Sequence, residues 1–356
     1  IGGDVLPVDI EPRGEGALCV VRRFPVGPVT AITPFNFPLN LVLHKVAPAI
    51  AAGNPVLLKP SPRTPMTADL LARAIEGSGW PRGGFSLLHA DPPVARPLWT
   101  DPRIRCVSFT GSDTVGWKIK EEASRRKVTL ELGGNAAAIV CADADVRDAA
   151  SKLAVAAFAY AGQVCIKAQR IFVAREVHRD FLDAFLEASR AIVPGDPAQE
   201  ATVLGPMIDE ESARRVESWV EQAREKGARV LLEPSREGAR LSPAVLSGVP
   251  AGSLVRDREV FGPVATVDAF SELSEAFAAA NDSPYGLQAS IFTRDIRGVL
   301  AAFEALEVGG VIVNEAPSLR IDNFPYGGVK ASGFGREGVR FAIEEMTEPR
   351  TLFLKA

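Results

Sequence analysis

The chain has 356 residues, of which 47% are hydrophobic and 24% charged, and its formal net charge is −4. This composition is typical of a folded protein of two or three domains. The slight negative charge excludes nucleic acid and anionic membranes as electrostatically favoured partners. The longest apolar stretch, at 153–166, is too short to span a bilayer.

The cysteines and histidines show no metal-ligand or disulfide spacing. Cys19, Cys106, Cys141 and Cys165 stand far apart, and the three histidines are scattered. We therefore expect neither a disulfide framework nor a metal site, and we expect a reducing, cytoplasmic location.

Short β-rich runs alternate with helical patterns along most of the chain, which predicts parallel sheets covered by helices on both faces. Strands are expected at 55–59, 106–111, 128–132, 137–141, 170–174, 264–270, 287–293 and 311–315. Helices are expected within 64–79, 113–126 and 177–192, and one should open at Asp145. The first of these helices shows an apolar face with Leu70, Leu71, Ala74 and Ile75. Residues 4–24 and 347–355 are typical of extended arms.

Two glycine patterns have the glycine spacing of phosphate-binding loops but lack the other features that such loops need. The pattern at 111–116 has Trp117 where a P-loop needs lysine, and the pattern at 333–338 follows a loop rather than a strand. Gly111 and Ser112 are more informative, because they stand between an expected strand and an expected helix. Free backbone N–H groups at such a helix start attract anions. A simple helix N-cap is the alternative interpretation of Ser112.

Five stretches have to be considered together. They are ITPFNFPLN (32–40), LLKPS (57–61), LELGGN (130–135), GQVC (162–165) and EVFGPV (259–264). In this order, with SFTGS, NDSPYGL and PYGGVKASGFGREG, they resemble the aldehyde dehydrogenase superfamily over essentially the whole chain. Within the superfamily, these motifs most resemble those of the lactaldehyde and phosphonoacetaldehyde dehydrogenase group. The resemblance implies an α/β fold with a Rossmann-like cofactor domain, an α/β catalytic domain and extended oligomerisation arms.

The resemblance also implies NAD(P)-dependent oxidation of a small aldehyde to a carboxylic acid. The Cys165 thiolate would attack the aldehyde, because hydride leaves a tetrahedral thiohemiacetal more easily than it leaves the aldehyde itself. The side-chain amide of Asn36 and the backbone N–H of Cys165 would stabilise the oxyanion. Glu131 would activate the water that hydrolyses the thioester. Taken alone, these residues are also compatible with an inert buried cysteine, a turn residue and a solvated acid.

The cofactor implied by the resemblance is NAD or NADP. Glu259 matches the acid that binds the nicotinamide ribose, with Phe261 beside it, and Lys59 matches the lysine that binds the adenosine ribose. Ser112 would lie at the pyrophosphate. The remaining expected cofactor-binding residues are Ile32, Thr33, Pro34, Phe35, Ser61, Arg63 and Leu132.

The sequence departs from the family pattern at three places. Pro62 stands where relatives strict for NAD often carry glutamate, and Arg63 follows it. The stretch at 87–98 lacks the glycine-rich turn that many relatives have there. The chain is also shorter than the family norm on its N-terminal side, so we expect the first helices of the cofactor domain to lie outside this sequence.

Two basic residues are candidates for contact with the tail of the substrate. Lys167 lies two residues after Cys165, and Arg320 lies in the loop SLRIDNF. Either side chain could meet an anionic or hydroxylated aldehyde, and a solvated or ion-paired surface role is the alternative for each. The physiological aldehyde stays open.

The resemblance divides the chain into five segments. We expect an oligomerisation arm at 1–24, an NAD(P)-binding domain at 25–133, a catalytic domain at 134–330, a return to the cofactor domain at 331–345 and an oligomerisation strand at 346–356. Because exposed strand edges tend to pair, the arms predict a homodimer or homotetramer. Two alternatives are a coenzyme A-acylating enzyme, which needs no hydrolytic base, and a non-catalytic relative that builds oligomers. Glu131 argues against the first, and Cys165, Glu131 and Asn36 together argue against the second.

Overall fold

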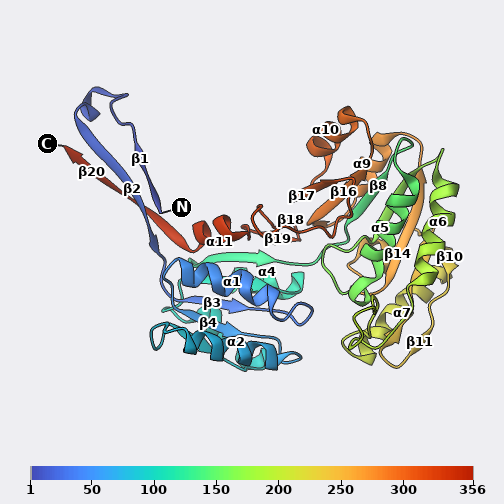
Figure 1. Cartoon of the computed structure of the whole chain (residues 1–356), viewed down its shortest axis with the longest axis horizontal. Coiled ribbons are helices and arrows are strands. Elements are labelled where there is room, and N and C mark those ends of the chain that lie inside the picture. Colours follow the sequence, from blue (N-terminus) through green and yellow to red (C-terminus); the bar gives the residue numbers. More distant parts are fainter. Residues whose placement is uncertain (1, 356) are drawn as a thin grey trace. The chain divides into compact units, whose positions relative to one another are not determined.

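The computed structural model describes residues 2–355 and consists of two compact units (Figure 1). The first unit runs to Glu131 and is completed by Ile321–Gly327 and by the chain from Phe334 onward. The second unit comprises Leu132–Arg320 and Gly328–Gly333. The division therefore falls after Glu131 rather than after residue 133, and the chain first returns to the first unit at Ile321 rather than at residue 331.

A parallel sheet forms the centre of the first unit. Its parallel strands are β3 (Val29–Ile32), β4 (Val56–Lys59), β5 (Phe85–Leu87), β6 (Cys106–Thr110) and β7 (Lys127–Glu131), in the order β7-β6-β3-β4-β5, and the two-residue strand β19 (Gly333–Phe334) adds a sixth strand next to β7. The helices are α1 (Asn40–Ala51), α2 (Pro65–Gly77), α3 (Pro97–Thr100), α4 (Asp113–Glu122) and α11 (Val339–Glu345), with a 3-10 turn η2 (Pro92–Val94). The strand order reverses direction between β3 and β6, as in a Rossmann-type half.

The core of the first unit lies between this sheet and its helices. Val29 and Leu58 from neighbouring strands are fully buried and pack with Val42 and Val46 of α1. Helix α2 buries less than its sequence pattern indicates: Leu71 and Ile75 pack against the core, but Leu70 is 64% exposed. Ala74 is exposed as well. The helix period was assigned correctly, but only half of the expected face meets the sheet.

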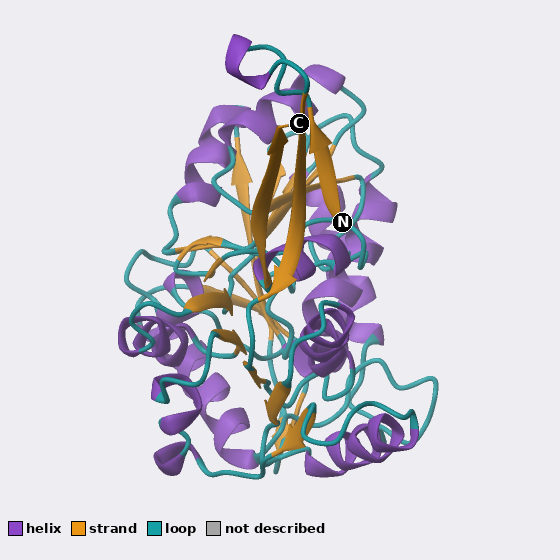
Figure 2. Cartoon of the chain, turned by 90° about the vertical axis from the view of Figure 1, so that its left-hand side faces the viewer, coloured by secondary structure: helices purple, strands orange, loops and turns teal. Residues whose placement is uncertain are grey.

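Three antiparallel strands make a separate sheet in the first unit. They are β1 (Gly3–Leu6), β2 (Ala17–Pro25) and β20 (Thr347–Lys355), in the order β1-β2-β20, with a 3-10 turn η1 (Pro12–Gly14) between the first two. Figures 1 and 2 show both ends of the chain at this sheet. The expected extended arms are thus two ends of the chain paired with each other.

The second unit is built on a seven-stranded sheet. Its order is β10-β13-β14-β9-β8-β16-β17, and only β10 is antiparallel to its neighbour. These strands are β8 (Ala137–Val140), β9 (Arg170–Ala174), β10 (Arg229–Leu232), β13 (Ala244–Ser247), β14 (Val264–Phe270), β16 (Gln288–Phe292) and β17 (Gly310–Val313). The short strands are β11 (Arg236–Glu237), β12 (Arg240–Leu241), β15 (Tyr285–Gly286) and β18 (Val329–Lys330), and the chain passes between units within β19 (Gly333–Phe334).

Helices cover both faces of this sheet. They are α5 (Val146–Phe158), η3 (Ala159–Gly162), α6 (His178–Ala191), α7 (Glu210–Glu225), α8 (Leu254–Asp257), α9 (Leu273–Asn281) and α10 (Ile296–Ala305). Successive residues of a strand point to opposite faces. Accordingly, Ala138 and Val140 of β8 pack with α5 and α6, whereas Ala137 and Ile139 pack with α9 and α10. The expected α/β class with parallel sheets is confirmed.

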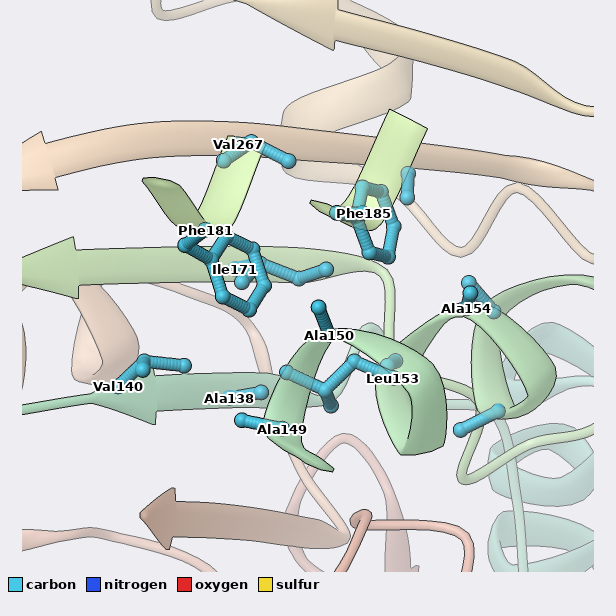
Figure 3. Packing of buried hydrophobic residues seen from close by; sticks show 14 of the residues in the cluster. Ala138, Val140, Ala149, Ala150, Leu153, Ala154, Ile171, Phe181, Phe185 and Val267 are labelled. Atoms are coloured by element: carbon cyan, nitrogen blue, oxygen red, sulfur yellow. The ribbon is translucent and has the colours of Figure 1, made fainter. Parts of the chain in front are cut away.

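Figure 3 shows part of the buried cluster that α5 and α6 form with strands β8, β9 and β14. Phe181 and Phe185, which the sequence pattern placed on one face of α6, are fully buried with ring centroids 5.6 Å apart. Helix α5 begins at the expected place, because the Asp145 side chain accepts a hydrogen bond from the Asp148 backbone N–H (3.1 Å).

The chemical inventory of the described residues is simple. All four cysteines are free thiols. Within residues 2–355, no group of three or more His, Cys, Asp or Glu side chains has an arrangement that could hold a metal ion. None of the helices within residues 2–355 has the length and apolar character needed to cross a membrane.

Candidate active site

A cleft opens in the first unit at the carboxyl ends of β3 and β6. The chain leaves these adjacent strands in opposite directions, toward β4 and toward β7. A crevice is expected at such a switch point, and it is where α/β sheets bind their ligands. A cavity of 440 Å³ lies there, and its lining includes Ile32, Thr33, Pro34, Lys59, Ser61, Pro62 and Gly111.

Lys59 ends β4 and contributes a buried cation to this cleft. Its side chain is 6% exposed, and Nζ donates a hydrogen bond to the Pro60 carbonyl (3.2 Å). Burial lowers the pKa of the Lys59 ammonium, and Asp91 partly opposes that shift by raising it. Ser61 follows, and its hydroxyl accepts a hydrogen bond from the backbone N–H of Arg63 (3.2 Å). A cation of this kind suits hydroxyl or phosphate groups of a nucleotide.

Helix α4 starts at the same cleft, after Gly111. Ser112 occupies its N-cap position with extended backbone angles, and its hydroxyl makes no capping hydrogen bond. The N-terminus of a ten-residue helix therefore opens next to a cleft-lining glycine. Helix N-termini attract anions. Of the expected cofactor residues in the first unit, Phe35, Arg63 and Ser112 do not line the cavity itself, and Leu132, Glu259 and Phe261 belong to the second unit.

Asn36 and Glu131 both lie buried in the first unit. Asn36 is in the segment between β3 and α1 and is 7% exposed. Glu131 ends β7 opposite Thr110 and is 3% exposed, so it is not the solvated acid of the alternative interpretation. A Cβ on Gly327 would lie 2.9 Å from the Glu131 carboxylate, so only a glycine fits beside it.

In the second unit, an unusual backbone turn leads to Cys165. After α5 the chain adopts left-handed angles at Tyr160 (φ 58°), Ala161 (φ 56°) and Gly162 (φ 63°). Left-handed angles are costly for residues with a Cβ, and functional sites are where such strain concentrates. A Cβ on Gly162 would lie only 2.2 Å from the Gly262 carbonyl oxygen, so the turn presses against the EVFGPV loop. Cys165 follows in a half-buried position.

Three of the motifs meet within the second unit. A Cβ on Gly134, in LELGGN, would lie 2.6 Å from the backbone oxygen of Cys165. The Gly134 backbone N–H donates a hydrogen bond to the Glu259 carboxylate (3.1 Å). A Cβ on Gly133 would lie 2.3 Å from the same carboxylate. The glycine pair is thus required for Cys165 and Glu259 to approach the same backbone segment.

The remaining predicted residues of the second unit differ in their surroundings. The Leu132 side chain is 2% exposed, and its backbone N–H donates to the Ser332 carbonyl (2.9 Å). Phe261 is half-buried and has φ 45°. Arg320 is half-buried at the end of a loop after β17. The Gln288 side chain supports that loop by donating to the Leu319 carbonyl (3.1 Å).

The expectation for Lys167 is corrected by the structure. Its side chain is 1% exposed, and Nζ donates to the Val264 carbonyl (2.7 Å). Burial lowers its pKa to about 7, against an opposing effect of Glu259. A lysine enclosed in this way is neither a surface group nor a contact for the tail of a substrate.

One buried pair was missed at the sequence level. Lys45 of α1 is fully buried, and its Nζ donates to the Glu337 carboxylate (2.6 Å) and to the Ser108 hydroxyl (3.2 Å). The detectable signal was a single lysine among the apolar residues of α1, next to the buried Val46. The pair ties the returning segment near α11 to the first unit.

The candidate residues are divided between the units. The first unit contains Asn36, Glu131 and the cleft residues, and the second contains Cys165, Glu259, Phe261, Leu132, Lys167 and Arg320. A nucleotide-type cleft in one α/β unit, and in the other a cysteine and a half-buried acid that both approach the Gly134 backbone, define a class: cofactor-dependent enzymes with a thiol nucleophile.

The chain belongs to the aldehyde dehydrogenase family, whose sequence model matches residues 1–352. It is 44% identical over 355 residues to 3-sulfolactaldehyde dehydrogenase of Priestia megaterium, covering 99% of this chain and 74% of that protein. It is 40% identical over 347 residues to lactaldehyde dehydrogenase of Methanococcus maripaludis, covering 96% and 74%. The crystal structure of glyceraldehyde-3-phosphate dehydrogenase GapN from Methanocaldococcus jannaschii, complexed with NADP, is similar with a TM-score of 0.94 at 39% identity, covering 99% and 77%. The chain is therefore an oxidoreductase of the aldehyde dehydrogenase type.

The contact between Gly134 and Cys165 gives a first prediction. Gly134→Ala should force the new Cβ against the Cys165 carbonyl and destabilise the second unit by about 1–3 kcal/mol, as overpacking of a closed site does. Urea denaturation measures the loss. Gly298→Ala, inside α10, is the matched control, because its Cβ would find only ordinary contacts of 3.7 Å or more. Equal stability of the two variants would contradict the close approach.

Proposed function

We propose that this chain oxidises a small aldehyde to its carboxylic acid through a covalent intermediate on Cys165. The observation that carries the proposal is the meeting of Cys165, Gly134 and Glu259 in the second unit. This arrangement places the candidate nucleophile and an acid that can accept hydrogen bonds from ribose hydroxyls against the same backbone segment. NAD or NADP is the proposed cofactor, and when bound its nicotinamide accepts the hydride.

The residues of the chain supply the other parts of the chemistry. The Cys165 thiolate adds to the aldehyde carbon, and the developing oxyanion is stabilised by the Asn36 amide and the Cys165 backbone N–H. After loss of hydride, the carbon is held as a thioester. Glu131 takes a proton from water, which then attacks the thioester and releases the acid and the thiol. Glu131 is buried rather than solvated, and the presence of a hydrolytic base supports hydrolysis over acyl transfer to coenzyme A, which needs no such base.

For the substrate, we propose a small aldehyde with a polar or anionic tail. Arg320 is the remaining basic candidate near the end of the β17 loop, now that Lys167 lies in the interior. The two dehydrogenases named above, for sulfolactaldehyde and lactaldehyde, support a short hydroxylated aldehyde.

The role of Glu131 is tested by Glu131→Gln. The variant should release about one equivalent of reduced cofactor per site and then stall, because oxidation needs no hydrolytic base but turnover does. Rapid-mixing absorbance follows the burst, and mass spectrometry should find the acyl group on Cys165. Cys165→Ser should show no burst, because a serine hydroxyl without an adjacent base is a weak nucleophile.

The experiment has a control variant and an outcome that would contradict the role of Glu131. Glu121→Gln, an exposed acid on α4, is the matched control and should turn over like the unaltered protein. Steady turnover of Glu131→Gln at the unaltered rate would show that another group is the base.

We also propose that NADP is accepted at least as well as NAD. Pro62 lines the cleft where a carboxylate would repel a 2′-phosphate, and Arg63 follows it on the exposed side. An arginine–phosphate contact contributes about 1.5–3 kcal/mol, or one to two decades in affinity.

Coenzyme choice is tested by the double variant Pro62→Glu with Arg63→Gln. It should lower kcat/KM for NADP by about tenfold to a hundredfold and leave kcat/KM for NAD nearly unchanged, because only the phosphate meets the new charge. Initial rates with each cofactor give the ratio. An unaltered protein that prefers NAD by more than about a hundredfold would refute the assignment.

For assembly, we propose that the β1-β2-β20 sheet of one protomer pairs with the β17 edge of a neighbour's seven-stranded sheet. β20 and β17 are both end strands in their sheet orders. Leu352 and Leu354 of β20 are 61% and 55% exposed, and α10 beside β17 exposes Leu300 and Phe303. Exposed strand edges with apolar side chains favour such pairing, and a homodimer or homotetramer would result.

Leu352→Asp combined with Leu354→Asp should therefore shift the protein to monomers, because apolar burial is lost and acidic groups are brought into the interface. Sedimentation velocity measures the state. Met66→Asp, at an apolar site on α2 that is even more exposed (76%), should keep the assembly. An unaltered protein that is monomeric at micromolar concentration contradicts the proposal.

A further inference from the structure

Lys167 is a buried cation with no part in the chemistry above. It is 1% exposed, and its chain neighbours Ile166 and Ala168 are buried apolar residues. Burying an ammonium is expensive, and an apolar side chain of similar length would avoid that cost. Simple packing therefore does not account for a lysine at this position.

The contacts of the ammonium lie on the loop that carries Glu259. Nζ donates to the Val264 carbonyl (2.7 Å), where β14 begins. Burial lowers the pKa of Lys167 to about 7, while the negative charge of Glu259 acts in the opposite direction and raises it. The charge interaction of this buried lysine is therefore with the acid proposed to bind the nicotinamide ribose.

Gln169 ties the same loop at a second point. Its Nε2 donates to the Arg258 carbonyl (2.7 Å), and its Oε1 accepts from the Val260 backbone N–H (3.0 Å). Both residues that flank Glu259 are thus bonded to one side chain. Lys167 and Gln169 are two positions apart, and both side chains reach the 258–264 loop. The segment that follows Cys165 therefore holds the loop that carries Glu259.

A second cation acts on Glu259 from α7. The Arg215 guanidinium donates to the Val260 carbonyl (2.8 Å). Burial lowers the pKa of Arg215, and Glu259 opposes that shift. Two cations therefore hold the loop at the Val260 and Val264 carbonyls, and the Gly134 backbone N–H holds the Glu259 carboxylate itself. All of these groups belong to the second unit.

We propose that Lys167 is a positioning residue for cofactor binding: its buried ammonium holds the loop that carries Glu259 and orients the Glu259 carboxylate toward the ribose hydroxyls. The inference rests on the proposed function, in which Glu259 accepts hydrogen bonds from the ribose. It assigns Lys167 an electrostatic role through Glu259, with no contact to substrate or to the reacting carbon.

The proposed role of Lys167 can be tested without turnover by measuring NADH binding through the fluorescence of NADH. NADH has no group that titrates between pH 6.5 and 8.5, whereas Lys167 passes from mostly charged to mostly neutral in that range. Lys167→Met should raise the Kd about tenfold at pH 6.5 and much less at pH 8.5, because only the charged form supports Glu259. Lys226→Met is the matched control, since this exposed lysine also donates to a backbone carbonyl, that of Gly252.

Lys167→Gln separates charge from hydrogen bonding and covers the case in which the methionine variant fails to fold. It retains a donor for the Val264 carbonyl but no charge, so it should bind NADH as weakly as Lys167→Met at pH 6.5. Thermal unfolding confirms that each variant is folded. Full affinity in Lys167→Gln would overturn the proposal, because the hydrogen bond alone would then suffice.

A double-mutant cycle with Glu259→Gln decides whether Lys167 acts through Glu259. Glu259→Gln should weaken NADH binding, and adding Lys167→Met should weaken it no further. Additive losses, or a Lys167→Met affinity equal to that of the unaltered protein, would overturn the role of Lys167 alone. Unchanged affinity in Glu259→Gln would instead contradict the ribose role of Glu259 in the proposed function.

Discussion

Backbone segments of the second unit approach so closely that no side chain fits between them, and the arrangement of the nucleophile depends on this. Gly134 lies against the Cys165 carbonyl, and Gly162 lies against the Gly262 carbonyl. A methyl group at either position would push a motif away from its neighbours. The glycines therefore act as spacers of minimum size, which fix where Cys165 and Glu259 lie relative to the 133–134 backbone.

Buried charges make the remaining long-range connections. Lys45 and Glu337 join α1 to a segment that is 292 residues distant in sequence. Arg170 donates to the carbonyls of Ala279 and Ala280 at the end of α9, which satisfies groups that a helix C-terminus leaves open. Such groups are stable in the interior only when partners and geometry are complete. Each of them therefore specifies one arrangement of distant segments.

The cofactor cleft follows from topology more than from any single residue. Because β3 and β6 are adjacent while their connections diverge, their carboxyl ends leave a crevice that side chains do not fill. Lys59 and the start of α4 then give the crevice its positive character. The start of α4 after Gly111 leaves helix N-terminal N–H groups beside this crevice, where an anion would be favoured.

The sequence by itself determined eight of the strands, the helix start at Asp145 and the residue types of the site, but it did not predict β3, which borders the cleft. The Asp145 cap and the Phe181 and Phe185 face of α6 were readable because they depend on neighbours within one or two turns. The role of Cys165 could be predicted because its motif is a contiguous stretch of sequence. Only the tertiary structure decided that Lys167 is enclosed, that Leu70 is exposed and that Lys45 meets Glu337. Periodicity within one segment indicates which face is apolar, but residues far away in the chain decide how much of that face is covered and which buried charges are paired.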